Sequence, residues 1–155
     1  MNISCTIIGN VCAGDGYAIQ VEEPYRKGLQ GLEGFSHILV VWYANQAISL
    51  PPEALVIPKP YQAGPEQIGV FATRSPYRVN PICVSVVPVQ SIDMETGTIH
   101  VHWIDALQDT PVLDIKPYHG SEDRVRDYST PPWCAHWPHW MEESEGFDWD
   151  AEFTF

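Results

Sequence analysis

The stretch that decides the fold is Ile38-Leu39-Val40-Val41-Trp42-Tyr43-Ala44. It is a nearly continuous apolar run of strand length, which is typical of a strand at the centre of a sheet. Shorter β-rich runs, bounded by glycine and proline, lie on both sides of it in the chain. We expect further strands at residues 3–9, 17–21, 68–72, 82–89, 99–104 and 112–115. The glycine turn Gly14-Asp15-Gly16 predicts that the first two of these pair as a hairpin or a meander.

The composition argues for one mainly β domain. The chain has 155 residues, and its 14 prolines and 11 glycines interrupt it too often for a helical bundle or a coiled coil. Strands do not alternate with long helices, so a parallel α/β sheet is not expected. We predict a mainly β fold with a single β-barrel domain over residues 1–118 and one or two short helices. Residues 22–32 have room for one or two helical turns.

Residues 119–155 differ from the rest of the chain and form what we call the C-terminal extension. They hold nine Asp and Glu but only two Arg, together with most of the tryptophans. Large aromatic side chains seek apolar cover and often lie at interfaces. We expect this acidic Trp/His-rich extension to pack on the barrel or on the partner of a dimer.

The charge balance restricts the partners of the protein. Eight Lys and Arg against 20 Asp and Glu give a formal net charge of −12, which argues against DNA and against any partner held mainly by phosphate contacts. The first cationic side chain is Arg26, so no signal peptide is expected. The longest uncharged stretch, residues 34–52, is polar in places and ends in two prolines, so no membrane span is expected. Four cysteines without a CxxC pair indicate a reducing, cytoplasmic location.

Several common catalytic and metal motifs are absent or incomplete. The chain has neither a GxxxxGK[ST] phosphate loop nor a GxSxG nucleophile turn. His100 and His102 would share one strand face, and Cys134, His136 and His139 lie close together in the extension. Each set lacks a ligand for a complete zinc site, so we expect no metal. The alternatives are partly exposed strand histidines and an extension that packs through its tryptophans.

Two polar segments remain as candidates for a binding site. Thr73-Arg74-Ser75-Pro76-Tyr77-Arg78-Val79-Asn80-Pro81 places two guanidinium groups in a proline-stiffened loop between expected strands. A guanidinium group binds a carboxylate through two parallel hydrogen bonds, which makes Arg74 and Arg78 candidates for an anionic ligand. In the second segment, residues 109–118, Asp114 and Lys116 alternate with apolar residues and would share a strand face. The alternative is a pair of rigid surface loops.

Three segments together resemble a known family. Gly69-Val-Phe-Ala-Thr-Arg-Ser-Pro-Tyr-Arg-Val-Asn-Pro-Ile82, Thr110-Pro-Val-Leu-Asp-Ile-Lys-Pro-Tyr118 and Leu32-Glu-Gly-Phe-Ser-His37 closely resemble the TsaA-like (TrmO) family of S-adenosylmethionine-dependent tRNA methyltransferases. The resemblance implies a TsaA-like β-barrel without a Rossmann fold, S-adenosyl-L-methionine as the methyl donor, and a homodimer. It also implies N6-methylation of a threonylcarbamoyl-modified adenosine next to the tRNA anticodon.

The resemblance also assigns roles to residues. Donor contacts carried over by motif are Ser36, His37, Arg74, Val84, Thr110, Pro111 and Val112. Residues expected to shape the pocket or orient the acceptor are Arg78, Asn80, Lys116 and Tyr118, and Asp114 is the hypothetical catalytic base or cation partner. Asp109 departs from the family because glycine is usual at this position.

The sequence leaves the acceptor open. Transfer RNA is possible, but the net charge of −12 disfavours it unless basic side chains gather in one patch. The alternatives are a small-molecule acceptor and a non-catalytic protein that binds S-adenosylmethionine. Clustering of five cations around one pocket would favour tRNA, and their dispersal would favour the alternatives; these cations are Arg26, Lys27, Lys59, Arg74 and Arg78.

Overall fold

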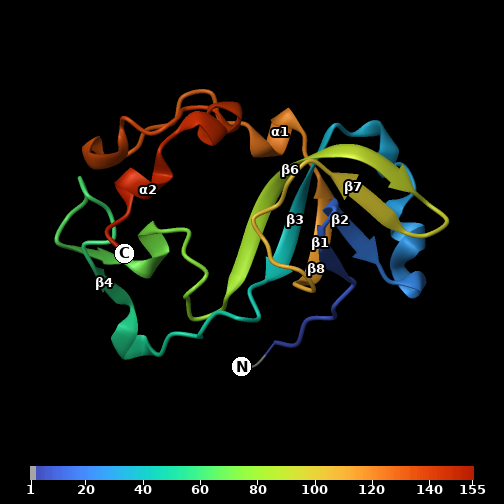
Figure 1. Ribbon diagram of the computed structural model, residues 1–155, viewed down its shortest axis with the longest axis horizontal. Coiled ribbons are helices and arrows are strands. Elements are labelled where there is room, and N and C mark those ends of the chain that lie inside the picture. The colour runs from blue at the N-terminus through green and yellow to red at the C-terminus, as the bar shows by residue number, and fades with distance from the viewer. Residues whose placement is uncertain (1–2) are drawn as a thin grey trace.

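The computed structural model describes residues 3–155 and shows a closed six-stranded antiparallel barrel (Figure 1). Neighbouring strands follow the order β1-β2-β7-β6-β3-β8, and a separate two-stranded sheet holds β4 and β5. The predicted mainly β barrel is therefore confirmed. The barrel strands are β1 Gly9–Gly14, β2 Gly16–Val21, β3 His37–Tyr43, β6 Ile82–Asp93, β7 Thr98–Val101 and β8 Pro111–Pro117.

Strand β3 is the centre of the sheet, as its apolar sequence predicts. It pairs with β6 along its whole length and with β8 from Ile38 to Trp42. Ile38 and Val40 are fully buried inside the barrel. Trp42 also points inward, where its indole N–H donates to the Ser85 hydroxyl at 3.0 Å, so the buried polar atom is satisfied. The alternate residues of β3 form its outward side.

The first hairpin begins later than the sequence predicts. The expected strand at residues 3–9 is wrong: β1 starts at Gly9, and its pairing with β2 runs from Gly9↔Val21 to Gly14↔Gly16. The predicted glycine turn closes the hairpin, with Gly16 at φ 127°. Ile8 still bonds through its backbone to Val112 and Glu22, but β2 ends at Val21 and the register of β8 with β1 covers Gly9 and Asn10, so residues 3–7 belong to no strand.

The other elements follow the expected order with changed lengths. Residues 22–32 form helical turns as expected, with 3₁₀ helices at Glu23–Leu29 and Leu32–Gly34. The turn at Glu95–Gly97 also forms, and backbone N–H groups of Thr96 and Glu95 bonded to Asp93 lower the pKa of its carboxyl group. The expected strand at 68–72 is shorter, because β5 ends at Gly69 and a 3₁₀ helix follows at Val70–Ala72.

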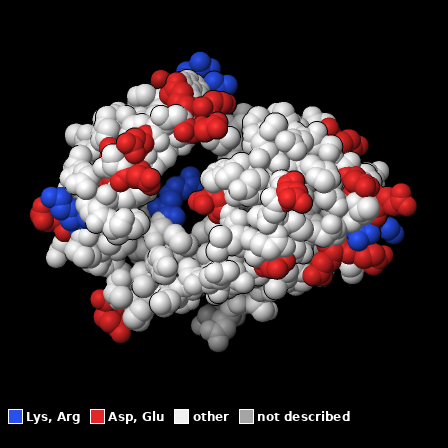
Figure 2. Space-filling view, in the orientation of Figure 1, with Lys and Arg blue, Asp and Glu red and all other residues white. Residues whose placement is uncertain are grey.

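Two segments outside the barrel strands, one between β3 and β6 and one after β8, lie together beside the barrel. Residues 45–81, which we call the arm, leave β3, form β4 Val56–Pro58 and β5 Gln67–Gly69, and return to β6. The extension carries α1 Gly120–Asp123, 3₁₀ helices at Pro132–Cys134 and Met141–Gly146, and α2 Trp149–Glu152. It crosses to the arm and closes a hollow that β6 and β3 border on the barrel side (Figures 1 and 2). Within residues 3–155, no helix has the length and apolar content that a membrane crossing needs.

The first prediction follows from the close approach of β1 to β2. A Cβ at Gly9 would lie 2.2 Å from the Gln20 carbonyl oxygen, whereas a Cβ at Gly14 meets no atom within 4 Å. Gly9→Ala should therefore lower the free energy of unfolding by about 1–3 kcal/mol, as overpacking does. Gly14→Ala is the matched control and should change it little. Equal effects of the two substitutions in chemical denaturation would contradict this packing.

Asp109 supplies the second prediction. Its φ is 62°, a left-handed conformation that favours glycine. That conformation costs a non-glycine residue about 1–2 kcal/mol, and the extra freedom of glycine in the unfolded chain offsets about 0.5–1 kcal/mol. Asp109→Gly should therefore stabilise the protein by roughly 0.5–1 kcal/mol in thermal or chemical unfolding. Asp105→Gly, at a residue without positive φ, should not; an equal gain there would contradict the explanation.

Candidate functional site

The outward side of the β6-β3-β8 sheet brings the two predicted segments together. Cross-strand partners on one side form two rows, Val84-Val41-Asp114 and Val86-Leu39-Lys116. We call this surface the outer face. It is open enough to leave Val84 40% exposed, although Val84 lies in the central part of the sheet. The outer face is therefore an apolar surface with one ion pair along its β8 side.

His37 closes one end of the outer face. The Nδ1 atom of His37 is hydrogen-bonded to the Ser36 hydroxyl, 2.9 Å away. The centroid of the His37 ring lies 6.1 Å from that of the Tyr118 ring. The backbone N–H of Tyr118 donates to the His37 carbonyl at 3.1 Å, which continues the pairing of β3 with β8. Residues predicted from two separate segments are thus neighbours: Ser36 and His37 from one, and Tyr118 from the other.

Arg74 reaches the outer face from the arm. Its Nη2 donates to the Val84 carbonyl oxygen at 2.9 Å, while the side chain stays exposed. One hydrogen bond occupies a fraction of the five N–H donors of a guanidinium group, so the fork keeps donors for a ligand. The structure places two of the predicted donor-binding residues, Arg74 and Val84, in direct contact.

Arg78 has a different role from Arg74. Its Nη1 donates to the carbonyl oxygens of Thr73 at 2.9 Å and Ser75 at 3.1 Å. The guanidinium group therefore braces the loop that carries Arg74. Burial raises the pKa of Cys83, with Asp105 also raising it and the two arginines lowering it. Cys83 lies on the inward side of β6, opposite Trp42, which agrees with an unreactive thiol.

Asp114 and Lys116 share the outer face, as their spacing predicts. Lys116 Nζ lies 2.6 Å from an Asp114 carboxylate oxygen, and this hydrogen bond raises the pKa of Lys116. The second carboxylate oxygen accepts the Ile115 backbone N–H at 2.9 Å. Both side chains are about half exposed, so solvent screens the pair and it contributes little to stability. The carboxylate is held in place and stays open to a ligand.

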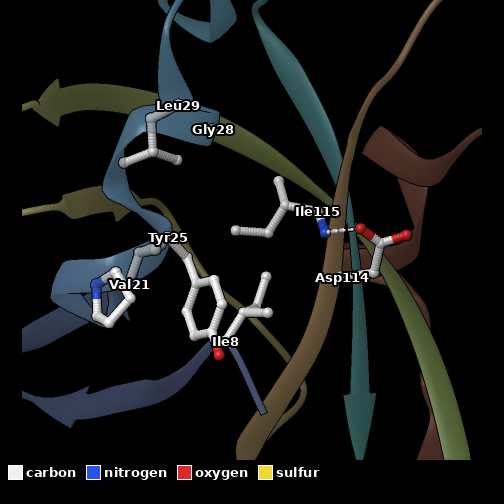
Figure 3. A pocket seen from close by; sticks show the side chains of 8 residues that line it. Ile8, Val21, Tyr25, Gly28, Leu29, Asp114 and Ile115 are labelled. Carbon is white, nitrogen blue, oxygen red and sulfur yellow. Dashed lines mark hydrogen bonds between the residues drawn. The ribbon is translucent and has the colours of Figure 1, made fainter. Parts of the chain in front are cut away.

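A pocket of about 380 Å³ lies behind β8, on the other side from the Asp114 carboxylate. Ile8, Tyr25 and Ile115 point into it, whereas the Asp114 carboxylate points away (Figure 3). The pocket is thus an apolar recess between the first 3₁₀ helix and the barrel. It is separate from the outer face, although Asp114 belongs to both.

Four predicted site residues do not join the outer face through their side chains. Thr110 is 3% exposed and Val112 fully buried in the barrel core, so neither side chain is open on the outer face. The cause is a bulge at Leu113, because Trp42 pairs with Val112 while Val41 pairs with Asp114. Pro111 pairs with Asn10 at the β1 side. Asn80 is exposed in the arm, where its carbonyl oxygen accepts the Ile82 N–H at 2.6 Å.

The histidines and cysteines have other partners. His102 Nδ1 lies 3.2 Å from the Gln90 amide nitrogen, and His136 Nε2 lies 2.7 Å from a Glu152 carboxylate oxygen. Cys134 is buried, with its thiol on the Pro131 carbonyl oxygen. Residues 3–155 contain no group of three or more His, Cys, Asp or Glu side chains placed to hold a metal ion.

The five cations that would mark a nucleic-acid surface are dispersed. Arg26 packs on the β6–β7 turn, donating to the carbonyl oxygens of Val21 and Glu95. Lys59 pairs with Glu66 in the arm at 3.2 Å. Only Arg74 and Arg78 of the five share a loop beside the outer face. In the view of Figure 2, Lys and Arg atoms lie in separate places, one of them in the wall of the hollow.

Sequence reasoning did not single out some residues at this site. Leu39, Val41 and Val86 form the apolar part of the outer face, and the alternation within β3 is the signal that identifies the first two. Asp105 lies near enough to Cys83 to influence its thiol. Tyr61 carries the contact between arm and extension, and no local pattern distinguishes it.

Comparison with known proteins identifies relatives of this chain. The chain is 36% identical over 107 residues to the "S-adenosyl-L-methionine-binding protein" of Archaeoglobus fulgidus, which covers 69% of this chain and 72% of that protein. It is 36% identical over 103 residues to the "tRNA (adenine(37)-N6)-methyltransferase" of Rattus norvegicus, covering 66% of this chain and 22% of that protein.

A solved structure matches as well. The crystal structure of TrmO from Pseudomonas aeruginosa superposes with a TM-score of 0.66 and 28% identity, over 83% of this chain and 61% of that one. The chain thus spans less than two thirds of the solved protein. The sequence-family model of the tRNA-methyltransferase O N-terminal domain matches residues 7–124, which include the barrel and the arm. The chain belongs to the tRNA-methyltransferase O (TrmO) family.

Proposed function

We propose that this member of the TrmO family uses S-adenosylmethionine to methylate N6 of adenosine 37 in tRNA, in its threonylcarbamoyl-modified form. The observation that carries the proposal is the contact between Arg74 of the arm and the Val84 carbonyl at the outer face. It joins a carboxylate-binding group to an apolar surface and, across one cross-strand row, to the Asp114 carboxylate. Relatives named for S-adenosylmethionine binding and for tRNA adenine(37) methylation support the proposal.

The residues present fit the donor. S-adenosylmethionine supplies a methyl group on a cationic sulfur and carries a carboxylate on its methionine part. Arg74 pairs with such a carboxylate through its remaining N–H donors. Val84 and the apolar residues in the two cross-strand rows would pack against an adenine ring. The rings of His37 and Tyr118 add aromatic side chains at one end of the outer face. Thr110 and Val112 would support the site rather than contact the donor, because their side chains are buried and their carbonyl oxygens accept backbone N–H groups of Val11 and Ile8.

Asp114 is the proposed proton acceptor. When the nitrogen–methyl bond forms and the sulfur–methyl bond breaks, the acceptor nitrogen must lose its proton. The Asp114 carboxylate takes that proton or passes it to water, and Lys116 keeps the carboxylate oriented. Positioning of the two reactants supplies the larger part of the rate, as expected for an in-line transfer.

The acceptor and the assembly belong to the same proposal. Because the cations are dispersed, the electrostatic attraction between this chain and RNA would be weak. This observation favours a small-molecule acceptor as the second candidate. We also propose the homodimer that the resemblance implies, because a second copy would add its own Arg74 and Arg78 to the cations available to RNA. The decisive comparison is methyl transfer from labelled S-adenosylmethionine to tRNA with and without the threonylcarbamoyl group, and to free nucleosides. Transfer to free nucleosides alone would refute the tRNA proposal.

The proposed role of Arg74 gives the third prediction. Arg74→Ala should raise the dissociation constant of S-adenosylmethionine about 10–100-fold, because a hydrogen bond to a charged group contributes about 1.5–3 kcal/mol. Isothermal titration calorimetry measures this constant. Arg126→Ala removes an exposed arginine of the extension instead and should leave the affinity unchanged. An affinity unaffected by Arg74→Ala would remove this residue from the donor site.

The proposed role of Asp114 gives the fourth prediction. Asp114→Asn keeps the shape but removes the proton acceptor, so single-turnover methyl transfer should slow about 10²–10⁴-fold. The affinity for the donor should change little, because Arg74 and the outer face remain. Asp127→Asn serves as a control with the same chemical change in the extension. Normal turnover of the Asp114 variant would show that another group or water takes the proton.

A further inference from the structure

We propose that the C-terminal extension holds the arm in the shape that presents Arg74 to the donor, with Tyr61 as the positioning residue. The extension would thereby set the affinity of the donor site without touching the donor. This inference rests on the proposed function for the ligand, but its structural part concerns the arm alone.

The arm has little support of its own. Its two strands, β4 and β5, have three residues each and form a separate two-stranded sheet. An isolated two-stranded sheet is marginally stable in water, and packing against another element is needed for independent stability. Val56 is 59% exposed and Ile57 half-buried, so apart from Tyr61 the apolar core of the arm is small and centres on Ile68 and Val70.

The extension supplies the missing apolar cover. Tyr61, in the β4–β5 connection, is 8% exposed because three aromatic rings of the extension surround it. Trp133 stacks on it at 5.1 Å between ring centroids, Trp137 meets it edge-on at 5.2 Å, and Phe153 lies at 5.8 Å. Burial accordingly raises the pKa of the Tyr61 hydroxyl. The aromatic cluster serves as a small second core shared by arm and extension.

Backbone hydrogen bonds extend the arm by a short third segment. Tyr61 and Phe153 form an antiparallel bridge, flanked by bonds from Gln62 N to Glu152 O at 2.9 Å and from Thr154 N to Pro60 O at 3.2 Å. The Thr154 hydroxyl also donates to the Lys59 carbonyl at 2.6 Å. The end of the extension thus pairs with the arm as a strand would, and the arm gains the third partner it lacks.

Glu152 fastens this segment to the rest of the extension. One carboxylate oxygen lies 2.7 Å from His136 Nε2, and the other accepts the Trp137 indole N–H at 3.0 Å. The hydrogen bonds from His136 and Trp137 lower the pKa of Glu152. The carboxylate therefore orients Trp137 against Tyr61.

Hydrogen bonds inside the arm connect its two-stranded sheet to the residue before Arg74. Val70 is fully buried, and its N–H donates to the Leu55 carbonyl at 2.9 Å. The buried Thr73 hydroxyl donates to the Val70 carbonyl at 2.9 Å, immediately before Arg74. If the arm unfolds, Arg74 loses its fixed distance from Val84, and only the folded fraction of molecules binds the donor well.

The test compares three variants of the full chain. Tyr61→Ala removes the ring that the extension covers, and Tyr61→Phe keeps the ring. Trp140→Ala removes an indole of the extension that is 55% exposed, away from Tyr61. If one molecule in ten keeps a folded arm, the apparent dissociation constant of S-adenosylmethionine rises about 10-fold in Tyr61→Ala. Tyr61→Phe and Trp140→Ala should stay near the unaltered affinity.

Turnover separates positioning from general damage. At saturating donor concentration, binding shifts the population to molecules with a folded arm. The maximal turnover of Tyr61→Ala should therefore remain near that of the unaltered chain, while its KM for the donor rises. Equal donor affinity in Tyr61→Ala and Tyr61→Phe would overturn the proposal. A loss of maximal turnover without a change in donor affinity would overturn it too.

Hydrogen exchange without donor provides an independent readout. Tyr61→Ala should lose amide protection at residues 56–73 and keep it in β3, because the barrel does not depend on Tyr61. Unchanged protection in the arm would overturn the proposal. If the unaltered chain fails to bind S-adenosylmethionine, the proposed function fails, and hydrogen exchange still decides whether the extension folds the arm.

Discussion

The hydrogen bonding of β3 along both of its edges is the constraint on which the other features depend. β3 pairs directly with β6 on one side and with β8 on the other, which fixes the register of both strands against it. That register aligns Val84, Val41 and Asp114 in one row and places His37 beside Tyr118. The inward residues of β3 fill the barrel, so the same strand fixes the core and the outer face.

The barrel and the arm contribute different parts of the proposed site. The barrel supplies a rigid surface whose shape follows from strand pairing. The arm supplies Arg74 from an element with a small core of its own, held by the aromatic cluster around Tyr61. Stability is therefore uneven along the chain, and the proposed donor site lies where a stable element meets a weaker one. Binding of a donor across this junction would stabilise the arm as well as the site.

The sequence predicts the parts of the fold that local pattern controls. The apolar run at residues 38–44, the turn at Gly14-Asp15-Gly16 and the shared face of Asp114 and Lys116 all form. The strand expected at residues 3–9 fails because its partners end too early, which is a non-local cause. The side chains of Val112 and Asp114 lie on opposite sides because of the bulge at Leu113, and simple alternation cannot foresee it. The contacts of Tyr61 span more than 70 residues, beyond any local pattern.

The most direct test of the account is to map donor binding on the unaltered chain by hydrogen exchange or amide chemical shifts during titration with S-adenosylmethionine. The account predicts saturable binding, with the largest changes at residues 73–75 in the arm, 82–86 in β6 and 114–118 at the end of β8. S-adenosylhomocysteine should produce the same map, and ATP should not. Saturable binding with changes confined to other surfaces, or no binding, would contradict the assignment of the outer face as the donor site.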